Sequence, residues 1–572
     1  MCLPLPGSGA HVGRCSSRRG AGARSLYLRR FGGFSGQGDS WADIRVSVSV
    51  HLGVECWPSG CARRRWNPVE EQIVALKHLE IEHKFDAAAE FVLPELDGLP
   101  GVASVGEPVT YELHASYFDT EDLRLAAQGI TLRRRRGGTD AGWHLKMPVG
   151  PDSKQELRAA LGRPRVVPVR LAGLVAAHTR GAALDQVATL DTERTVVRLY
   201  GEDGTMLVEV ADDLVTGQDA RGGAPRQWRE VEVELGDGAP ELLKAVGKRL
   251  RKSGAKRAAS SSKLGRLLDG AVVPSEAKAA RAETRARLVA LTTNGKAPAV
   301  TTGDAVMGYL AAQVEAVFEY DPKARVGEDD AVHRMRVAVR RIRSTLKSYR
   351  PVLNVDGSLG EELKWLAAVL GEVRDLEVLR MRFQERLDGA ASGWMEELAR
   401  RERGAYRRLN ASLKEPRYFA LLETLEELVA HPPLGRAAEK KARKELPVLV
   451  TKAWERMAKD YASIAVAEDE DVARHDTRKA AKRARYAAEV AVPVLGVAAR
   501  RVVKDAKRIQ EVLGEHQDGV IAMQHLEEAA RRARAVADAF ALGVLYGAER
   551  CDAEAARDRL AVTWSQTLGP SF

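Results

Sequence analysis

The spacing of apolar residues changes once along this chain of 572 residues, near position 300. From Leu79 to about Leu268, short segments alternate apolar and polar residues, and Gly-rich or Asp-Gly turns separate them. After about Ala305 the apolar residues recur with helical spacing, and Gly and Pro become sparse. Alternation is typical of half-buried strands, whereas helical spacing is typical of amphipathic helices. The sequence therefore predicts an α+β multidomain protein, with a β-sandwich or barrel followed by an all-helical domain.

The domain boundaries follow from the same change in pattern. Residues 1–76 are rich in Gly, Ser and Arg without sustained periodicity, which predicts a disordered or misassigned N-terminal extension. The alternative is an anion-binding arm that uses Arg63, Arg64 and Arg65. The remaining intervals are predicted as a β domain at 77–270, a linker at 271–302 and a helical domain at 303–567.

Composition excludes several classes of protein. Aromatic residues make up only 5% of the chain, which counts against a stacking surface for single-stranded nucleic acid. Because no run of about 18 apolar residues occurs, no transmembrane helix is expected, and the N-terminus lacks the order of a secretory signal. Cys551 is the only cysteine beyond residue 61, so a disulfide framework is excluded for the main body and a cytoplasmic protein is expected.

Several predicted strands carry charge on one face and apolar residues on the other. In "HLEIEHKFD", Glu80, Glu82 and Lys84 occupy alternate positions and therefore project the same way. Such charges usually face solvent, but inside a closed barrel they would combine the carboxylates that Mg²⁺ prefers with the cations that grip phosphate. The other charged faces hold Arg133 and Arg135, then Lys146, then Arg194 and Arg198, then Glu209 and Asp213, and finally Glu230, Glu232 and Glu234.

The helical half contains an internal repeat. "HRMRVAVRRIR" at 333–343 matches "HDTRKAAKRAR" at 475–485, and "LGEVRD" at 370–375 matches "LGEHQD" at 513–518. The offsets are nearly equal, which indicates two copies of one helical unit related by a pseudo-two-fold axis. A single basic helix face is usually only solvated. Two matched faces brought together predict a concave strip that suits a linear polyanion.

The β segments, taken in order, resemble the CYTH family, the triphosphate tunnel metalloenzymes. "EIEHKF" resembles the ExExK signature, "YFDTEDLRLAAQGITLRRRRG" at 117–137 the next block, and "SSSKLGRLL" at 260–268 the closing Ser-Lys segment. The resemblance implies an eight-stranded antiparallel tunnel that hydrolyses or cyclises triphosphates with Mg²⁺ or Mn²⁺. It also implies catalytic roles for Glu80, Glu82 and Lys84, and a structural role for His83.

The same resemblance assigns two sets of ligands. The implied metal ligands are Glu80, Glu82, Glu209, Asp213, Glu230 and Glu232. The implied triphosphate-binding cations are Lys84, Arg133, Arg135, Lys146, Arg194 and Lys263.

The repeated helical motif resembles the CHAD family, the conserved histidine α-helical domains, over about residues 303–565. This resemblance implies two helical bundles around a basic channel, with inorganic polyphosphate as the ligand. Gln517 stands where the first copy has Arg374, so we expect fewer phosphate contacts from the second copy. The implied polyphosphate-binding residues are His333, Arg336, Arg340, Arg341, Arg343, His475, Arg478, Lys482, Arg483 and Arg485.

Together these patterns lead to one hypothesis: metal-dependent hydrolysis of inorganic triphosphate or polyphosphate in the tunnel, with polyphosphate held by the helical domain. The expected partners are tripolyphosphate and long-chain polyphosphate, with no membrane, in the cytoplasm or at polyphosphate granules. Three alternatives stay open. They are a non-catalytic polyphosphate-binding or granule-targeting protein, a nucleic-acid-binding basic bundle, and a class IV-type adenylate cyclase.

Overall fold

The computed structural model describes residues 78–150, 152–273, 275–293, 300–387 and 393–572. The predicted N-terminal extension, 1–76, lies outside these residues.

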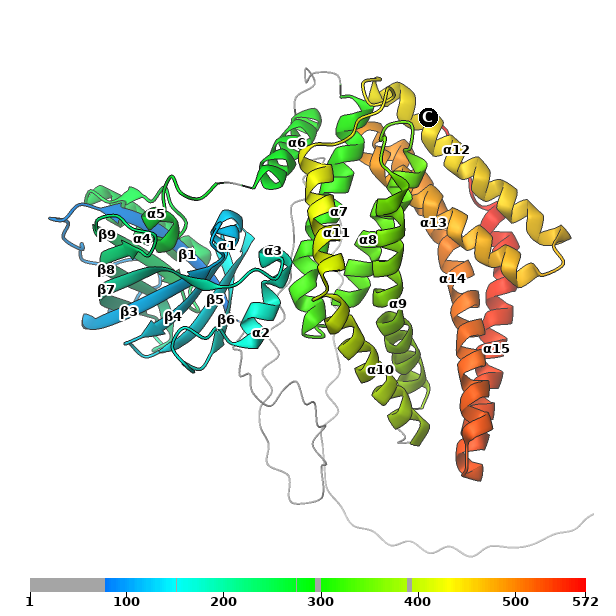
Figure 1. The fold of residues 1–572 in the computed structure, drawn as a ribbon, viewed down its shortest axis with the longest axis horizontal. Helices are drawn as coiled ribbons and strands as arrows, with labels where there is room; N and C mark the ends of the chain where they lie inside the picture. The colour runs from blue at the N-terminus through cyan, green and yellow to red at the C-terminus, as the bar shows by residue number, and fades with distance from the viewer. Residues whose placement is uncertain (1–77, 151, 274, 294–299, 388–392) are drawn as a thin grey trace, which may run out of the picture. The chain divides into compact units, whose positions relative to one another are not determined.

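A closed antiparallel β-barrel forms the β domain (Figure 1). β1 pairs with both β6 and β9, and this double pairing closes a ring of eight strands, as predicted. The ring order is β1 (His78–Ala87), β6 (Ser153–Ala159), β5 (Gly142–Gly150), β4 (Thr131–Arg136), β3 (Val109–Asp119), β7 (Asp185–Tyr200), β8 (Met206–Asp219) and β9 (Arg226–Leu235). Two short strands add to it: β2 (Ser104–Val105) on β7 and β10 (Lys256–Arg257) on β1.

Much of the hydrophobic core of this domain lies outside the barrel wall. On β9, Val231 and Val233 alternate with the glutamates and pack with Val246 and Leu250 of α4 (Pro240–Lys252). A second cluster packs Trp228, which lies on the same face of β9 as Glu230, against α5 (Lys263–Leu267). Where the apolar face of a strand packs on the outside, its charged face lines the interior. The remaining short helices are α1 (Arg124–Gln128), α2 (Val169–Leu174) and α3 (Ala176–Thr179).

The second half is helical, as predicted (Figure 1). α6 lies inside the interval 271–302, where a linker was predicted, so part of that interval is a regular helix. The helices are α6 (Glu276–Thr293), α7 (Thr302–Arg325), α8 (Ala331–Ser348), α9 (Gly357–Arg386), α10 (Gly393–Ser412), α11 (Pro416–Ala430), α12 (Ala442–Ala462), the 3₁₀ turn η1 (Ser463–Val466), α13 (Glu470–Leu495), α14 (Val497–Arg532) and α15 (Val536–Ser565).

The two basic motifs lie on α8 and α13, and the two "LG" motifs lie on α9 and α14. Met335, Val339 and Ile342 are fully buried on α8, which leaves the basic residues on the other face. α8 contacts α13, and the Tyr349 hydroxyl just after α8 donates a hydrogen bond to the Ala487 carbonyl, at 2.7 Å. The repeated basic faces therefore belong to neighbouring helices.

Candidate functional site

A cavity of about 280 Å³ runs inside the barrel, and all eight strands of the ring contribute to its lining. Most of the lining side chains are charged, so the interior is the polar side of this sheet. The cations are Lys84, Arg133, Arg135, Lys146, Lys154, Arg158, Arg194, Arg198 and Lys263; the carboxylates are Glu80, Glu82, Asp140, Glu156, Glu209, Glu232 and Glu234.

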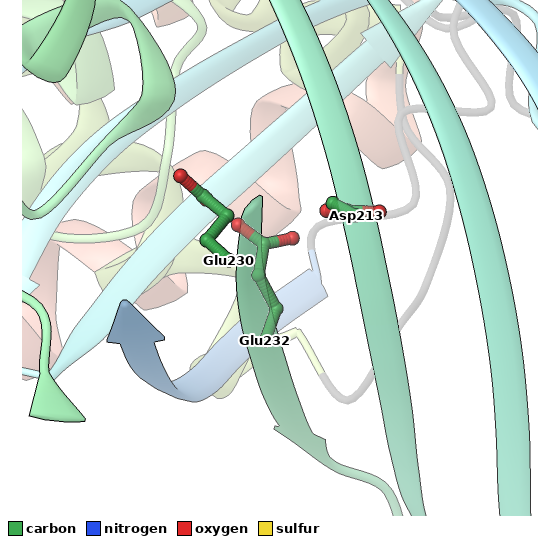
Figure 2. A group of neighbouring side chains, drawn as sticks. All are labelled: Asp213, Glu230 and Glu232. Carbon is green, nitrogen blue, oxygen red and sulfur yellow. The ribbon is translucent and has the colours of Figure 1, made fainter. Parts of the chain in front are cut away.

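Three predicted metal ligands meet on two adjacent strands. Figure 2 shows Asp213 on β8 and Glu230 and Glu232 on β9. One oxygen from each carboxylate lies within 4.8 Å of the others. The Lys263 ammonium contacts all three, at 2.7, 2.9 and 2.8 Å respectively. A cation is therefore already favoured at this point of the lumen.

Arg194 holds the same acidic cluster from β7. Its Nε and Nη2 donate to the two oxygens of Asp213, at 2.7 and 2.6 Å. Burial alone would raise the pKa of Asp213, but Arg194 and Lys263 outweigh burial and lower it. The pKa of Glu232 is lowered well below its usual value, because Lys263, Lys84 and Arg194 likewise outweigh burial. Both carboxylates are therefore ionised at neutral pH.

The three alternate residues of β1 all point into the cavity. Glu80 accepts a hydrogen bond from Lys146 at 2.6 Å, and Glu82 accepts one from Lys154 at 2.8 Å. Lys84 pairs with Glu82 at 3.1 Å and with Glu232. Burial would raise the pKa of Glu82, yet Lys84 and the other nearby cations lower it to about 2.

Several carboxylates gather near Glu234, which lies opposite Glu82 in the β1–β9 register. Burial, and then the neighbouring Glu80, raise the pKa of Glu234 to about 7. Glu209 contributes to this shift as well, although it also pairs with Arg198 at 2.9 Å. A cation entering the lumen would be stabilised beside these carboxylates.

The residues present therefore fit a divalent metal ion. Carboxylate oxygens are the ligands that Mg²⁺ prefers. The group of Asp213, Glu230 and Glu232 could hold such an ion only if the Lys263 ammonium moved away from their oxygens. The second group of carboxylates, Glu80, Glu82 and Glu234, lies beside the ammonium groups of Lys84, Lys146 and Lys154.

Guanidinium groups gather on the β4 side, where Arg135 also pairs with Asp140. Burial, and then Arg133 and Arg194, lower the pKa of Arg135 to about 9. The Nε atoms of Arg133 and Arg135 are buried, and neither has a hydrogen-bond partner among the described residues. Unpaired buried donors are costly unless a ligand satisfies them. These two guanidinium groups are therefore suited to an anion.

β6 supplies lumen residues that the sequence analysis missed. Lys154, Glu156 and Arg158 alternate along "SKQELRA" and line the cavity. Glu156 accepts from Arg158, and it bonds the Nδ1 of His144 at 2.8 Å. Burial lowers the pKa of that histidine to about 4. The alternation in this short segment was the signal that could have identified them.

A cavity of about 690 Å³ lies along the basic faces of α8 and α13. Four of the predicted polyphosphate-binding residues line it, together with cations that were not predicted. Its cationic lining is Arg340, Arg343 and Lys347 of α8, Arg350 just after α8, and Lys479, Lys482 and Arg483 of α13.

Lys482 is the most crowded of these cations. In the described part of the chain no carboxylate lies within ion-pair distance of its ammonium. Burial, followed by repulsion from Arg340 and Arg478, lowers its pKa to about 6. Positive charge is thus concentrated here beyond what the protein itself neutralises.

The other predicted contacts divide into two groups. Arg341 and Arg485 both pair with Glu489, at 3.1 and 2.9 Å, so these two guanidinium groups share one carboxylate within the bundle. The two histidines differ from each other. His475 Nδ1 bonds the Gln517 side chain at 2.9 Å, whereas His333 lies near the charge of Arg374. Burial lowers the pKa of both histidines.

No helix among the described residues is long and apolar enough to cross a membrane.

Comparison with known proteins agrees with both halves of the structure. The CYTH domain model matches residues 78–267, and the CHAD domain model matches residues 308–527. Rv2226, an uncharacterized protein of Mycobacterium tuberculosis strain H37Rv, is 37% identical over 526 residues, which cover 86% of this chain and 97% of that protein. The counterpart from strain CDC 1551 matches equally.

Two solved structures are similar to part of the chain. PptA from Streptomyces chartreusis is 24% identical with a TM-score of 0.39, and covers 46% of this chain and 100% of its own. The CHAD domain from the plant Ricinus communis is 27% identical with a TM-score of 0.40, and covers 48% and 94%. With the domain matches and the full-length relatives, the chain belongs to the family of proteins that join a CYTH domain to a CHAD domain.

Proposed function

We propose that the barrel hydrolyses inorganic triphosphate or the end of a polyphosphate chain with Mg²⁺ or Mn²⁺, and that the helical domain binds polyphosphate. One observation carries the first part. One lumen holds carboxylates of β8 and β9 whose oxygens lie within 4.8 Å of one another, together with the buried guanidinium groups of Arg133 and Arg135 on β4. A phosphate chain with its metal ion matches that separation of charge.

The chain's own residues act mainly through position and charge. Arg133 and Arg135 donate bidentate hydrogen bonds to phosphate oxygens and hold the substrate along the lumen. Lys146 and Lys154 on the adjoining strands offset the charge on the leaving phosphate. A bound divalent ion would supply further charge neutralisation and orient the phosphates. Positioning and electrostatics suffice, since phosphoryl transfer needs little covalent assistance.

Phosphate release from tripolyphosphate, ATP and long polyphosphate, each with and without Mg²⁺, tests the barrel. We expect metal-dependent release from tripolyphosphate, and a loss of about a hundredfold or more in Glu82→Gln. Glu193→Gln is the matched control, because Glu193 lies exposed on β7. Equal activity in the Glu82 variant and the wild type would rule out the site.

The same assay distinguishes the alternatives. Cyclic AMP formed from ATP would identify a cyclase. An absence of phosphate release with all three substrates would leave a binding protein whose barrel is catalytically idle.

Binding to the helical domain is a separate measurement. We expect long polyphosphate to bind tightly at low salt and to displace RNA or DNA in competition. A preference for nucleic acid would contradict the proposal.

A further inference from the structure

The second repeated motif, "LGEVRD" and "LGEHQD", places a glycine at the same position of α9 and α14. Each glycine is buried beneath a guanidinium group. A Cβ atom on Gly371 would lie 3.2 Å from Nη2 of Arg336, and one on Gly514 would lie 3.4 Å from Nη2 of Arg478. Each arginine is therefore laid across bare backbone of the neighbouring helix.

The aspartate that ends each motif completes the arrangement. Because it follows the glycine by four residues, it lies on the same face of the helix. Arg336 Nη1 donates to Asp375 at 2.9 Å, and Arg478 Nη2 donates to Asp518 at 3.4 Å.

Neither arginine is fully satisfied by these contacts. The Nε atoms of Arg336 and Arg478 are both buried and have no hydrogen-bond partner among the described residues. The same two arginines contribute to the positive potential at Lys482, so they lie near the cationic cavity. The two copies thus keep the same Gly–Arg–Asp geometry, although the surroundings of His333 and His475 differ.

We propose that Gly371 and Gly514 are positioning residues for the bound polyanion, which hold Arg336 and Arg478 flat and extended beside the cavity. The inference rests on the proposed binding of polyphosphate. A free arginine side chain loses much conformational entropy when it is ordered by a ligand. An arginine ordered in advance by Gly and Asp loses less, and the difference appears as affinity.

Polyphosphate affinity of the full chain, measured against salt concentration, tests this role. Gly371→Leu and Gly514→Leu replace bare backbone with a side chain in the space of the guanidinium group. We expect each to weaken binding about tenfold, as for one lost charge-assisted contact, and to lower the slope of log affinity against log salt by about one. Gly543→Leu on α15 is the matched control, since nothing lies within 4 Å of its Cβ position.

A double-mutant cycle separates positioning from folding. In an Arg336→Ala background, Gly371→Leu should cost no further affinity, because the glycine acts only through that arginine. Additive losses would overturn the inference, as would an unchanged salt slope in both glycine variants. If the Leu variants melt early, Gly371→Ala, which adds one methyl group, is put through the same cycle.

The two proposals fail in different ways. Wild-type protein that does not bind polyphosphate would overturn the proposed function and this inference together. If the wild type binds polyphosphate but the affinity losses of Arg336→Ala and Gly371→Leu add, only this inference would be overturned.

Discussion

At the scale of single residues, Lys482 is a group whose charge depends strongly on its surroundings. An ordinary lysine is protonated up to about pH 10.4. Burial among Arg340 and Arg478 lowers the pKa of Lys482 to about 6, so the folded protein holds this side chain largely neutral at pH 7. A phosphate beside it would favour the charged form, and binding would then take up a proton.

The direction in which pH changes polyphosphate affinity follows from this uptake of a proton. Above pH 6 the proton must be taken from solution, so polyphosphate affinity should fall as pH rises, by up to about tenfold per unit. The polyphosphate affinity of Lys482→Arg, whose side chain stays charged, should not change over the same pH range. We would measure both between pH 7 and 9, where His333 and His475, with pKa values lowered by burial, remain neutral. If polyphosphate affinity fell with pH equally in Lys482→Arg and in the wild type, another group would take up the proton.

Folding stability should respond to the same residue. Because the folded-state pKa lies below the unfolded one, the unfolded chain binds the extra proton between about pH 6 and 10, and stability rises with pH across that window. Lys482→Met should remove this rise and stabilise the protein at pH 7 by about 1 kcal/mol or more. Urea unfolding at pH 7 and pH 9 measures the effect. The same change in unfolding free energy from pH 7 to pH 9 in the variant and the wild type would contradict this prediction.

At the scale of elements, the placement of Lys263 depends on one short helix. Lys263 begins α5, and the Ser262 side chain caps that helix by accepting a hydrogen bond from the Gly265 N–H at 3.0 Å. Ser262→Ala should cost about 1 kcal/mol and loosen the ammonium that sits among Asp213, Glu230 and Glu232. Ser262→Thr retains a capping oxygen and serves as the control. Triphosphate hydrolysis and thermal melting, measured together, would separate a local effect from unfolding, and full activity in the alanine variant would contradict the dependence.

Alternation in the sequence was sufficient to identify β5, β7, β8 and β9, since each has several apolar residues on one face, and β4, whose Leu132 follows Ile130 at the alternate position. It was not sufficient for β6, whose one large apolar side chain, Leu157, is only partly buried. Alternation also fixes which residues share a face, but not whether that face is inside or outside. Closure depends on the pairing of β1 with β9, which is a tertiary property.

The helical repeat shows the same limit. The resemblance implied polyphosphate contacts for Arg341 and Arg485, but the sequence could not show that both also pair with Glu489, a residue outside the repeated motif. The "LG" motif was visible as a repeat, yet its geometry required coordinates, because a glycine says nothing about which side chain covers it.

At the scale of the whole molecule, the two sites that we propose for condensed phosphate differ in their exposure to solvent. Lys84, Arg194 and Lys263 in the barrel are enclosed, and each is paired with a carboxylate. The helical site is a larger cavity whose cations exceed its carboxylates. Salt screens exposed charges strongly and enclosed charges much less.

The two sites should therefore separate in a salt titration. If about four phosphates are contacted, polyphosphate affinity should fall roughly fiftyfold between about 50 and 200 mM salt. The KM for tripolyphosphate in the barrel should change only a few-fold over the same range, since its ion pairs are shielded from the counter-ions. Arg343→Ala removes a cation that lines only the helical cavity. It should lower the slope of log polyphosphate affinity against log salt by about one, and leave the salt dependence of the KM for tripolyphosphate unchanged. A common salt dependence for binding and hydrolysis would mean instead that one surface, not two, controls access of polyphosphate to this protein.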